Sequence, residues 1–182
     1  MTRIAILATI EAAPTAWQPM LAAVAAQLGM LPNLYRLISV RPQSLGGYLG
    51  LYKALGRRQL SLETWNRIAL AVAEANRSEY CLAEHIYMGR DLLKMNEDEM
   101  EANRAGQSGN ERPALVRFAA KVTSARGRIF EGDLDLVRAV GYGDDEIIET
   151  ISLVAINTWA NYITKIFDTK VDFPVVVEYE PA

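Results

Sequence analysis

The sequence contains only one cysteine and one histidine among its 182 residues. A single cysteine excludes a disulfide within the chain, so an oxidised thiol would be a sulfenic acid, a mixed disulfide or a bridge between subunits. The two residues also give too few ligands for a metal site unless carboxylates or another subunit complete it. Phosphate-binding loops and zinc-ribbon spacings are missing too. We therefore predict no metal and no cofactor, and a reducing cytoplasm as the location.

Excess charge and long apolar runs are also lacking. The net charge is −3, with 19 Lys and Arg against 22 Asp and Glu, and no basic stripe is found. This balance gives no reason to expect a nucleic-acid partner. No apolar stretch approaches the length that crosses a bilayer, and the run from Ile4 to Ile10 is cut short by Glu11 and Pro14. We expect neither nucleic acid nor a membrane as partner, and we interpret the start as a short extended arm.

Helical periodicity dominates the rest of the chain, and strand-like signals are confined to its ends. With 182 residues the chain is long enough for one domain with its own core. We predict a single-domain, all-α helical bundle over residues 1–182, with short extended arms at both ends. A polar loop is predicted at 106–111 and an extended tail at 171–177. The predicted helices cover 16–28, a short segment from 31, then 43–55, 61–76, 78–93, 97–105, 113–123, 131–140 and 144–166.

The last predicted helix has a wide apolar face. Such a face is typical of a core or of an interface with a partner helix. It favours a homo-oligomer without fixing the symmetry. The residues of this face are Ile147, Ile148, Ile151, Val154, Ala155, Thr158, Trp159, Tyr162, Ile163 and Ile166.

The cysteine and the histidine, Cys81 and His85, are four residues apart and so share one face of a helix, with Cβ atoms roughly 5–6 Å apart. If Ser78 caps this helix, Cys81 lies in its first turn, where the helix dipole favours an anionic sulfur. An imidazole nearby also lowers a thiol pKa, so the pattern predicts a reactive thiolate. Ser78 could also donate a hydrogen bond to the sulfur. The alternative is a small buried cysteine and a histidine that only satisfies polar neighbours.

The segment around this pair resembles the carboxymuconolactone decarboxylase and alkylhydroperoxidase D superfamily, in its peroxidase-related branch. That family has a Cys-x-x-Cys-x-x-x-His motif at a helix start and a glutamate twelve residues before it. Here the motif reads Ser78-x-x-Cys81-x-x-x-His85, with Asn66 at the glutamate position. The specific core of the resemblance covers about residues 60–93. Further similar segments are Leu31 to Tyr35, Asn157 to Tyr162 and Asp172 to Pro174.

The resemblance implies an all-helical subunit that forms dimers, trimers or hexamers and reduces peroxides with an external thiol donor. Cys81 matches the cysteine that meets substrate, and His85 matches the proton-relay histidine. Ser78 replaces the other cysteine, so the internal disulfide of the usual cycle cannot form. Asn66 replaces the relay glutamate, so the proton must come through water, Glu84 or another residue.

Two neighbours of the motif complete the set of candidate site residues. We expect Glu84, directly before His85, to be a solvated side chain. Tyr80, together with Glu79, could line an entrance or could serve only as a packing and surface residue.

Three functions are compatible with these residues. The leading hypothesis is a one-cysteine peroxidase in which Cys81 attacks a hydroperoxide, His85 assists proton transfer and an external thiol completes the cycle. The second is decarboxylation or isomerisation of a small lactone or organic acid, with His85 as the acid–base group. The third is a family member without catalytic activity that serves as a binding or scaffolding protein.

Overall fold

A computed structural model describes residues 2–56, 59–104 and 113–173 of the chain. Within these ranges the protein has nine α-helices and no strand, which confirms the predicted all-α class. Two 3₁₀ turns, η1 (Ile10–Ala12) and η2 (Thr15–Trp17), precede the first α-helix. The helices are α1 (Gln18–Leu28), α2 (Asn33–Ile38), α3 (Pro42–Leu55), α4 (Leu62–Ala75), α5 (Glu79–Tyr87), α6 (Glu97–Arg104), α7 (Pro113–Ser124), α8 (Glu131–Ala139) and α9 (Asp144–Ile166).

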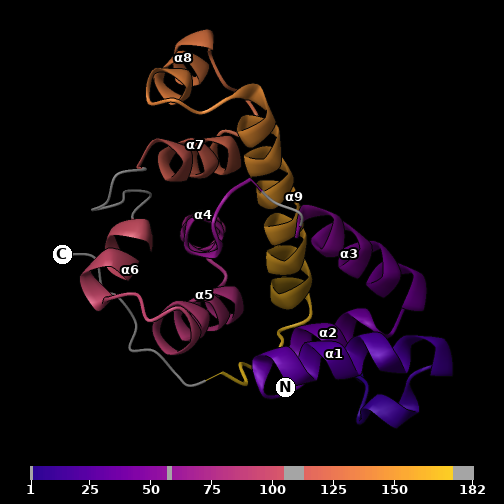
Figure 1. Ribbon diagram of the computed structural model, residues 1–182. Coiled ribbons are helices and arrows are strands. Elements are labelled where there is room, and N and C mark those ends of the chain that lie inside the picture. Colours follow the sequence, from indigo (N-terminus) through magenta and orange to yellow (C-terminus); the bar gives the residue numbers. More distant parts are fainter. Residues whose placement is uncertain (1, 57–58, 105–112, 174–182) are drawn as a thin grey trace.

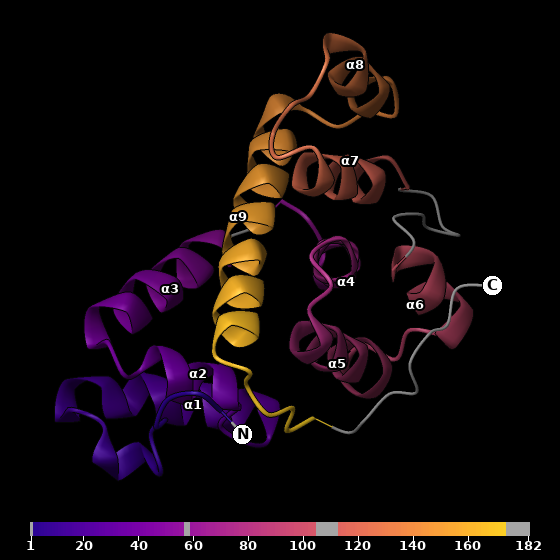
Figure 2. The ribbon, with the colours of Figure 1, turned by 180° about the vertical axis from the view of Figure 1, so that it is seen from behind.

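The longest helix, α9, runs through the middle of the molecule and contacts most of the others (Figure 1). Its first turns lie beside α8 and α7, and its last turns lie near α1 and α2. Helix α3 flanks one side of α9, whereas α4, α5 and α6 lie on the other side, and the view from behind shows the same arrangement (Figure 2). The segment that carries Cys81 and His85 is therefore packed directly against α9.

Local signals account for most of the helix ends. The hydroxyl of Ser61 accepts the backbone N–H of Thr64 (3.2 Å) and caps α4. Gly29 ends α1 in the left-handed conformation at φ 76°, which glycine adopts without a steric cost. The apolar side chains of α4 form a buried stripe, with Ile68 and Val72 fully inside. Because these signals act within one or two helical turns, the sequence predicts where these helices begin and end.

Helix α5 departs from the prediction. We expected one α-helix from Ser78 to about Leu93, but the α-helix ends at Tyr87 and continues as a π-helical turn, η3 (Met88–Leu92). Ser78 occupies the N-cap position without a capping bond from its side chain, which contacts Thr164 instead. Single π turns are frequent next to functional sites, and this one begins three residues after His85.

Three apolar clusters make up the core of the described residues. The first joins α1, α2 and α3 to α5 and the last turns of α9, and it contains Cys81. The second joins α4, α7 and α8 to the first half of α9. A smaller third cluster lies between α4, α5 and α6. Helix α9 thus belongs to two separate apolar regions, and each contains one buried glutamate.

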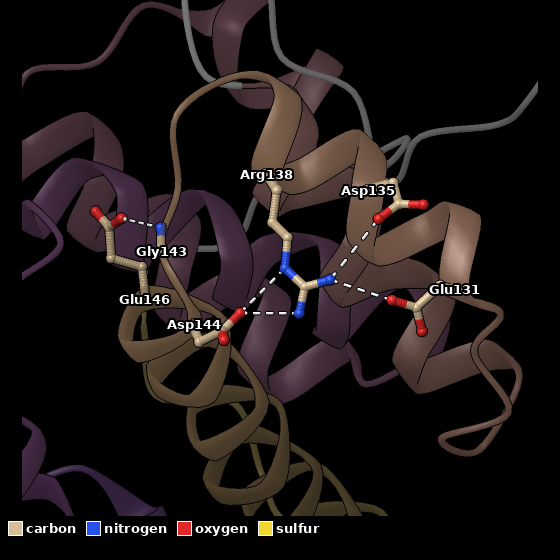
Figure 3. Close-up of polar contacts among 6 residues, drawn as sticks. All are labelled: Glu131, Asp135, Arg138, Gly143, Asp144 and Glu146. Carbon is tan, nitrogen blue, oxygen red and sulfur yellow. Dashed lines mark hydrogen bonds and ion pairs between the residues drawn. The ribbon is translucent and has the colours of Figure 1, made fainter.

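The corner between α8 and α9 is held by surface charges (Figure 3). The guanidinium of Arg138 donates to Asp144 through Nε (3.1 Å) and Nη2 (2.9 Å), and it pairs with Glu131 at 3.2 Å and Asp135 at 3.7 Å. The backbone N–H before α9 donates to Glu146 (3.0 Å). All these groups are solvent-exposed, so each pair contributes at most about 1 kcal/mol, and the network mainly orients α8.

The apolar face of α9 is divided between core and solvent. Ile147, Val154 and Ala160 are buried, whereas a stripe along the other side is exposed. The homo-oligomer stays a prediction, and this stripe is the surface on which it would depend. The large hydrophobic residues exposed there are Ile148, Ile151, Tyr162 and Ile166.

The structure describes almost all of the N-terminal arm but only the start of the predicted C-terminal tail. Residues 2–9 contain no helix and run beside other segments, with backbone bonds from Arg3 to Phe167 (2.8 Å) and from Leu7 to Arg36 (3.4 Å). The predicted loop at 106–111 and the tail from 174 onwards lie outside the described residues. Across the described ranges, no helix combines the length and the apolar character that crossing a bilayer requires.

Candidate active site

Cys81 lies in the first turn of α5 and is only 1% exposed. Its Sγ is 3.8 Å from the hydroxyl of Thr164 on α9. Burial raises the pKa of the Cys81 thiol to about 11, and the charge of Glu84 adds to the rise. Hydrogen bonds from Ser78, Asn161 and Thr164 oppose it without cancelling it. The predicted thiolate with a lowered pKa is therefore wrong, because desolvation outweighs the helix terminus, although Ser78 does act to lower the thiol pKa.

His85 is held by two amides rather than by the cysteine. Its Nδ1 lies 3.2 Å from Oδ1 of Asn66, and its Nε2 lies 3.2 Å from Oδ1 of Asn157. Burial lowers the pKa of His85 to about 4, and the bond to Asn157 only partly offsets this. A neutral imidazole has one N–H and donates to one of the two oxygens at a time. His85 is therefore neutral at pH 7, and the expected contact with the Cys81 thiol is not among its hydrogen bonds.

Asn66 occupies the position where the resembling family has a glutamate, and here it orients the histidine. Its Nδ2 donates to the backbone oxygen of His85 (3.0 Å) and also contacts Sδ of Met95 at 3.7 Å. Gly89 in η3 makes this approach possible, because a Cβ there would lie 2.8 Å from Nδ2 of Asn66. An uncharged amide fits this role, since it positions the ring without supplying a proton.

Glu84 is buried, so the expectation of a solvated side chain is wrong. Only 6% of the residue is exposed, and no hydrogen bond or ion pair joins its carboxyl to another described residue. Burial raises the pKa of Glu84 to about 8, and the charge of Asp172 raises it further. Glu84 is buried because it is three residues after Cys81 and therefore faces the same side of α5 as the sulfur.

A cavity of about 100 Å³ lies between α5, α9 and the helices α3 and α4. Glu84 and His85 contribute to its wall from α5, and Asn66 and Asn157 contribute from α4 and α9. Cys81 is not in the wall but lies one helical turn beyond Glu84. Apolar and aromatic side chains make up most of the lining, including Leu28, Tyr35, Tyr48, Leu49, Tyr52, Trp65, Ala69, Met88, Leu153, Ile156 and Ala160.

Two tyrosines of this cavity were not predicted as site residues. Tyr35 on α2 and Tyr48 on α3 pack edge to face with ring centroids 6.0 Å apart. Both are buried, and no hydrogen bond joins either hydroxyl to a described residue. Burial raises the pKa of each well above that of free tyrosine, and the charges of Glu84 and Cys81 add to the rise. The hydroxyls therefore remain protonated, next to the carboxyl and the thiol.

A second, more open cavity of about 210 Å³ lies on the other flank of Cys81. Ser78 and Thr164, which hydrogen-bond the sulfur, are both in its wall, together with Glu79 and Tyr80. The hydroxyl of Tyr80 donates to Asp172 (2.8 Å) and accepts the backbone N–H of Leu34 (3.0 Å). Tyr80 therefore lines a cavity and also joins α5 to α2 and to the segment after α9.

The sequence contained a signal for some of the residues that the prediction missed. Asn157 and Asn161 lie in the segment that resembles the closing helix of the family, and Tyr35 ends the similar segment near the start. Their side chains, however, meet the Cys81 helix only after α2 and α9 have packed against it. Among the described residues, no cluster of three or more Cys, His, Asp or Glu side chains is arranged to hold a metal ion.

The arrangement of helices is similar to solved structures over nearly the whole chain. One is the alkylhydroperoxidase AhpD core of an uncharacterized peroxidase-related protein from Ralstonia eutropha JMP134, with a TM-score of 0.84, 19% identity, and 94% of this chain and 92% of that chain covered. Another is an uncharacterized peroxidase-related protein from Silicibacter sp. TM1040, with a TM-score of 0.80, 23% identity, and coverage of 93% and 91%.

A third similar structure contains a ligand. It is a cysteine-to-alanine variant of the debrominase Bmp8 in complex with 2,3,4-tribromopyrrole, with a TM-score of 0.80, 20% identity, and coverage of 94% of this chain and 92% of that one. No protein-family model and no curated protein matches the sequence. The chain therefore has the AhpD-like fold that its resemblance implied, and at these identities the likeness establishes the fold alone.

Proposed function

We propose that the protein is a thiol-dependent peroxidase that reduces a small organic hydroperoxide at Cys81. The observation that carries this proposal is the position of the only thiol of the chain. Its sulfur lies 3.8 Å from the hydroxyl of Thr164, and Ser78 and Asn161 also act to lower the thiol pKa. One helical turn away, a largely apolar cavity has an ionisable carboxyl in its wall. A purely structural cysteine would need neither the polar partners nor the cavity.

The reaction leaves Cys81 as a sulfenic acid. The sulfur attacks the terminal oxygen of the hydroperoxide, the O–O bond breaks, and the leaving alkoxide takes a proton to become an alcohol. One external thiol then forms a mixed disulfide with Cys81 and releases water, and a second external thiol frees Cys81. Because Ser78 replaces the second cysteine of the motif, this external thiol is required in every cycle.

The lining of the cavity favours an organic hydroperoxide over hydrogen peroxide. The walls are largely aliphatic and aromatic, and such surfaces gain free energy by covering an apolar ligand. His85 supports the site as a neutral, oriented ring between Asn66 and Asn157. In this proposal its contribution is a fixed dipole in the wall of the cavity, not a charge.

The test is the consumption of tert-butyl hydroperoxide with dithiothreitol as reductant. Wild type should consume it steadily, and Cys81→Ser should reduce the rate to that of the uncatalysed mixture. Ser124→Ala, an exposed change far along the chain on α7, is the matched control and should retain full activity. Equal consumption by wild type and Cys81→Ser would refute the proposal.

A second candidate is thiol-dependent removal of halogen from a small aromatic ring. The observations that favour it are the aromatic walls of the cavity and the fold shared with a debrominase bound to 2,3,4-tribromopyrrole. In balanced form, the halogenated ring and two thiols give the dehalogenated ring, a disulfide and hydrogen halide. Incubation with 2,3,4-tribromopyrrole and dithiothreitol should then release bromide, and Cys81→Ser should not. If neither substrate is converted, the non-catalytic alternative gains support.

A further inference from the structure

We propose that Glu84 is the proton carrier of the site: its carboxylate takes the proton of the Cys81 thiol and delivers it to the alkoxide that leaves the substrate. This inference rests on the proposed peroxidase function and adds a catalytic role to it. It assigns proton transfer to a residue that the resembling motif does not contain, in place of His85 and of the missing glutamate at position 66.

The position of Glu84 fits a carrier between sulfur and cavity. Glu84 follows Cys81 by three residues on α5, so both side chains face the same side of the helix. The Glu84 side chain is in the cavity wall, whereas the sulfur lies one turn further on. A group that exchanges protons with both the thiol and a bound substrate must lie at this boundary.

The carboxyl of Glu84 lacks the partners that buried carboxyls normally have. It is buried, yet no described residue donates a hydrogen bond to it or pairs with it. Burying a polar group without a partner costs free energy, and a carboxyl used only for structure would be expected to have donors around it. Glu84 is in the wall of the cavity, so a molecule bound there would contact this side chain.

The ionisable groups near Glu84 leave it as the best proton acceptor for the thiol. On its own helix these groups are Tyr80, Cys81 and His85. From α2, α3 and the segment after α9 they are Tyr35, Tyr48, Tyr52 and Asp172. The hydroxyls of Tyr35, Tyr48 and Tyr80 stay protonated. Asp172 already accepts two hydrogen bonds, from Tyr80 and from the N–H of Asn33. The residues that α9 contributes to the cavity wall do not titrate; they are Leu153, Ile156, Asn157 and Ala160.

His85 is poorly placed for the same task. Both ring nitrogens are engaged with Asn66 and Asn157, and its hydrogen bonds do not reach the sulfur. Burial also keeps its pKa near 4, so the ring is a weak base at neutral pH. The pKa of Glu84, raised by burial to about 8, is closer to that of the thiol and suits transfer in both directions near neutral pH.

The step balances without another reactant. The thiol proton moves to the Glu84 carboxylate, and the thiolate attacks the terminal oxygen of the hydroperoxide. As the O–O bond breaks, Glu84 returns the proton to the alkoxide. The products are the Cys81 sulfenic acid, the alcohol and the Glu84 carboxylate, ready for the next cycle.

The test compares two reactions of Cys81 that differ in their need for a proton. Alkylation by iodoacetamide releases iodide, which needs no proton, whereas reduction of tert-butyl hydroperoxide releases an alkoxide, which does. In Glu84→Gln the loss of the negative charge lowers the thiol pKa, so alkylation becomes faster. Peroxide reduction should instead fall by about 100-fold, the usual contribution of general acid–base catalysis. In Glu84→Asp part of the peroxide rate should return.

The controls separate this inference from the proposed function. Asp145→Asn changes an exposed carboxyl in the first turn of α9, outside both cavities, and should leave both rates within about twofold of wild type, as expected for a screened surface charge. If Glu84→Gln accelerates both reactions equally, Glu84 acts only through its charge and the relay is refuted. If Cys81→Ser still consumes peroxide, the proposed function itself fails. Circular dichroism confirms that each variant is folded.

Discussion

The two apolar regions that share α9 each contain a buried glutamate, and the two side chains have opposite surroundings. Glu149 in the second cluster is 9% exposed, and it accepts Nε1–H of Trp65 (2.8 Å) and the backbone N–H of Gln59 (3.0 Å). Glu84, beside the first cluster, is 6% exposed and has no hydrogen bond or ion pair with a described residue. Burial is nearly equal, and only the hydrogen bonding differs.

This difference separates a structural carboxyl from a functional one. Glu149 joins α9 to α4 and to the segment before α4, so its charge is used to hold helices together. Glu84 holds no elements together, and its burial only raises its pKa. A buried ionisable group that stabilises nothing in the fold is retained for its chemistry, in agreement with the role proposed above.

The same substitution at the two sites should have opposite effects on stability. Glu149→Gln replaces one acceptor oxygen with an NH₂ group that faces an N–H donor, so the free energy of unfolding should fall by about 2–3 kcal/mol. Glu84→Gln removes an unpaired ionisable group, so the free energy of unfolding at pH 8 should stay the same or rise. Urea unfolding of the two variants and wild type measures both. A loss at Glu84 as large as at Glu149 would contradict the comparison.

The pH dependence of stability should reveal the protonation state of Glu84 in the folded protein. Its pKa is about 8 in the folded protein and near 4.5 when unfolded, so between these values the folded state binds more protons. Stability therefore falls as pH rises through this window, by about 1.4 kcal/mol per pH unit. His85 has the opposite sign, because its pKa falls from 6.5 to about 4, and its contribution is complete above pH 6.5.

Between pH 6.5 and 8, the change in stability with pH therefore comes from Glu84 rather than from His85. The thiol of Cys81 titrates only at higher pH. Wild type should lose about 2 kcal/mol across this interval, and Glu84→Gln should lose almost none. Glu149→Gln is the control and should keep the slope of wild type. A flat wild-type curve would mean that Glu84 is charged in the folded protein at pH 6.5.

The sequence predicted the fold well because helix signals are local. Ser61, Gly29 and the stripe on α4 act within a turn or two, so their helices end close to the expected residues. The end of α5 was missed because the π turn at Met88–Leu92 is associated with a tertiary contact: Gly89 packs under Asn66, which lies on another helix. No local pattern contains that contact.

The site was predicted in part, and its location was predicted better than its electrostatics. Ser78 lies beside Cys81 and Asn66 contacts His85, but no hydrogen bond joins the cysteine to the histidine. Helix position and the nearby imidazole pointed to a lowered thiol pKa, but full burial raised it instead. The depth of burial depends on how α2, α3 and α9 pack over α5, and a single sequence does not give that packing.

The smallest expected effect is that of replacing Thr164, whose hydroxyl lies near the thiol of Cys81. Thr164→Val keeps the shape of the side chain and removes a hydroxyl 3.8 Å from Sγ of Cys81, one of the groups that lower the thiol pKa. Losing one such bond, about 1 kcal/mol, should slow iodoacetamide alkylation at pH 8 roughly fivefold. Thr158→Val is the matched control, because Thr158 contacts Asn76 and makes no hydrogen bond to the sulfur. Equal alkylation rates in both variants would show that the Thr164 hydroxyl serves only its own helix, where it donates to the backbone oxygen of Ala160 (2.9 Å).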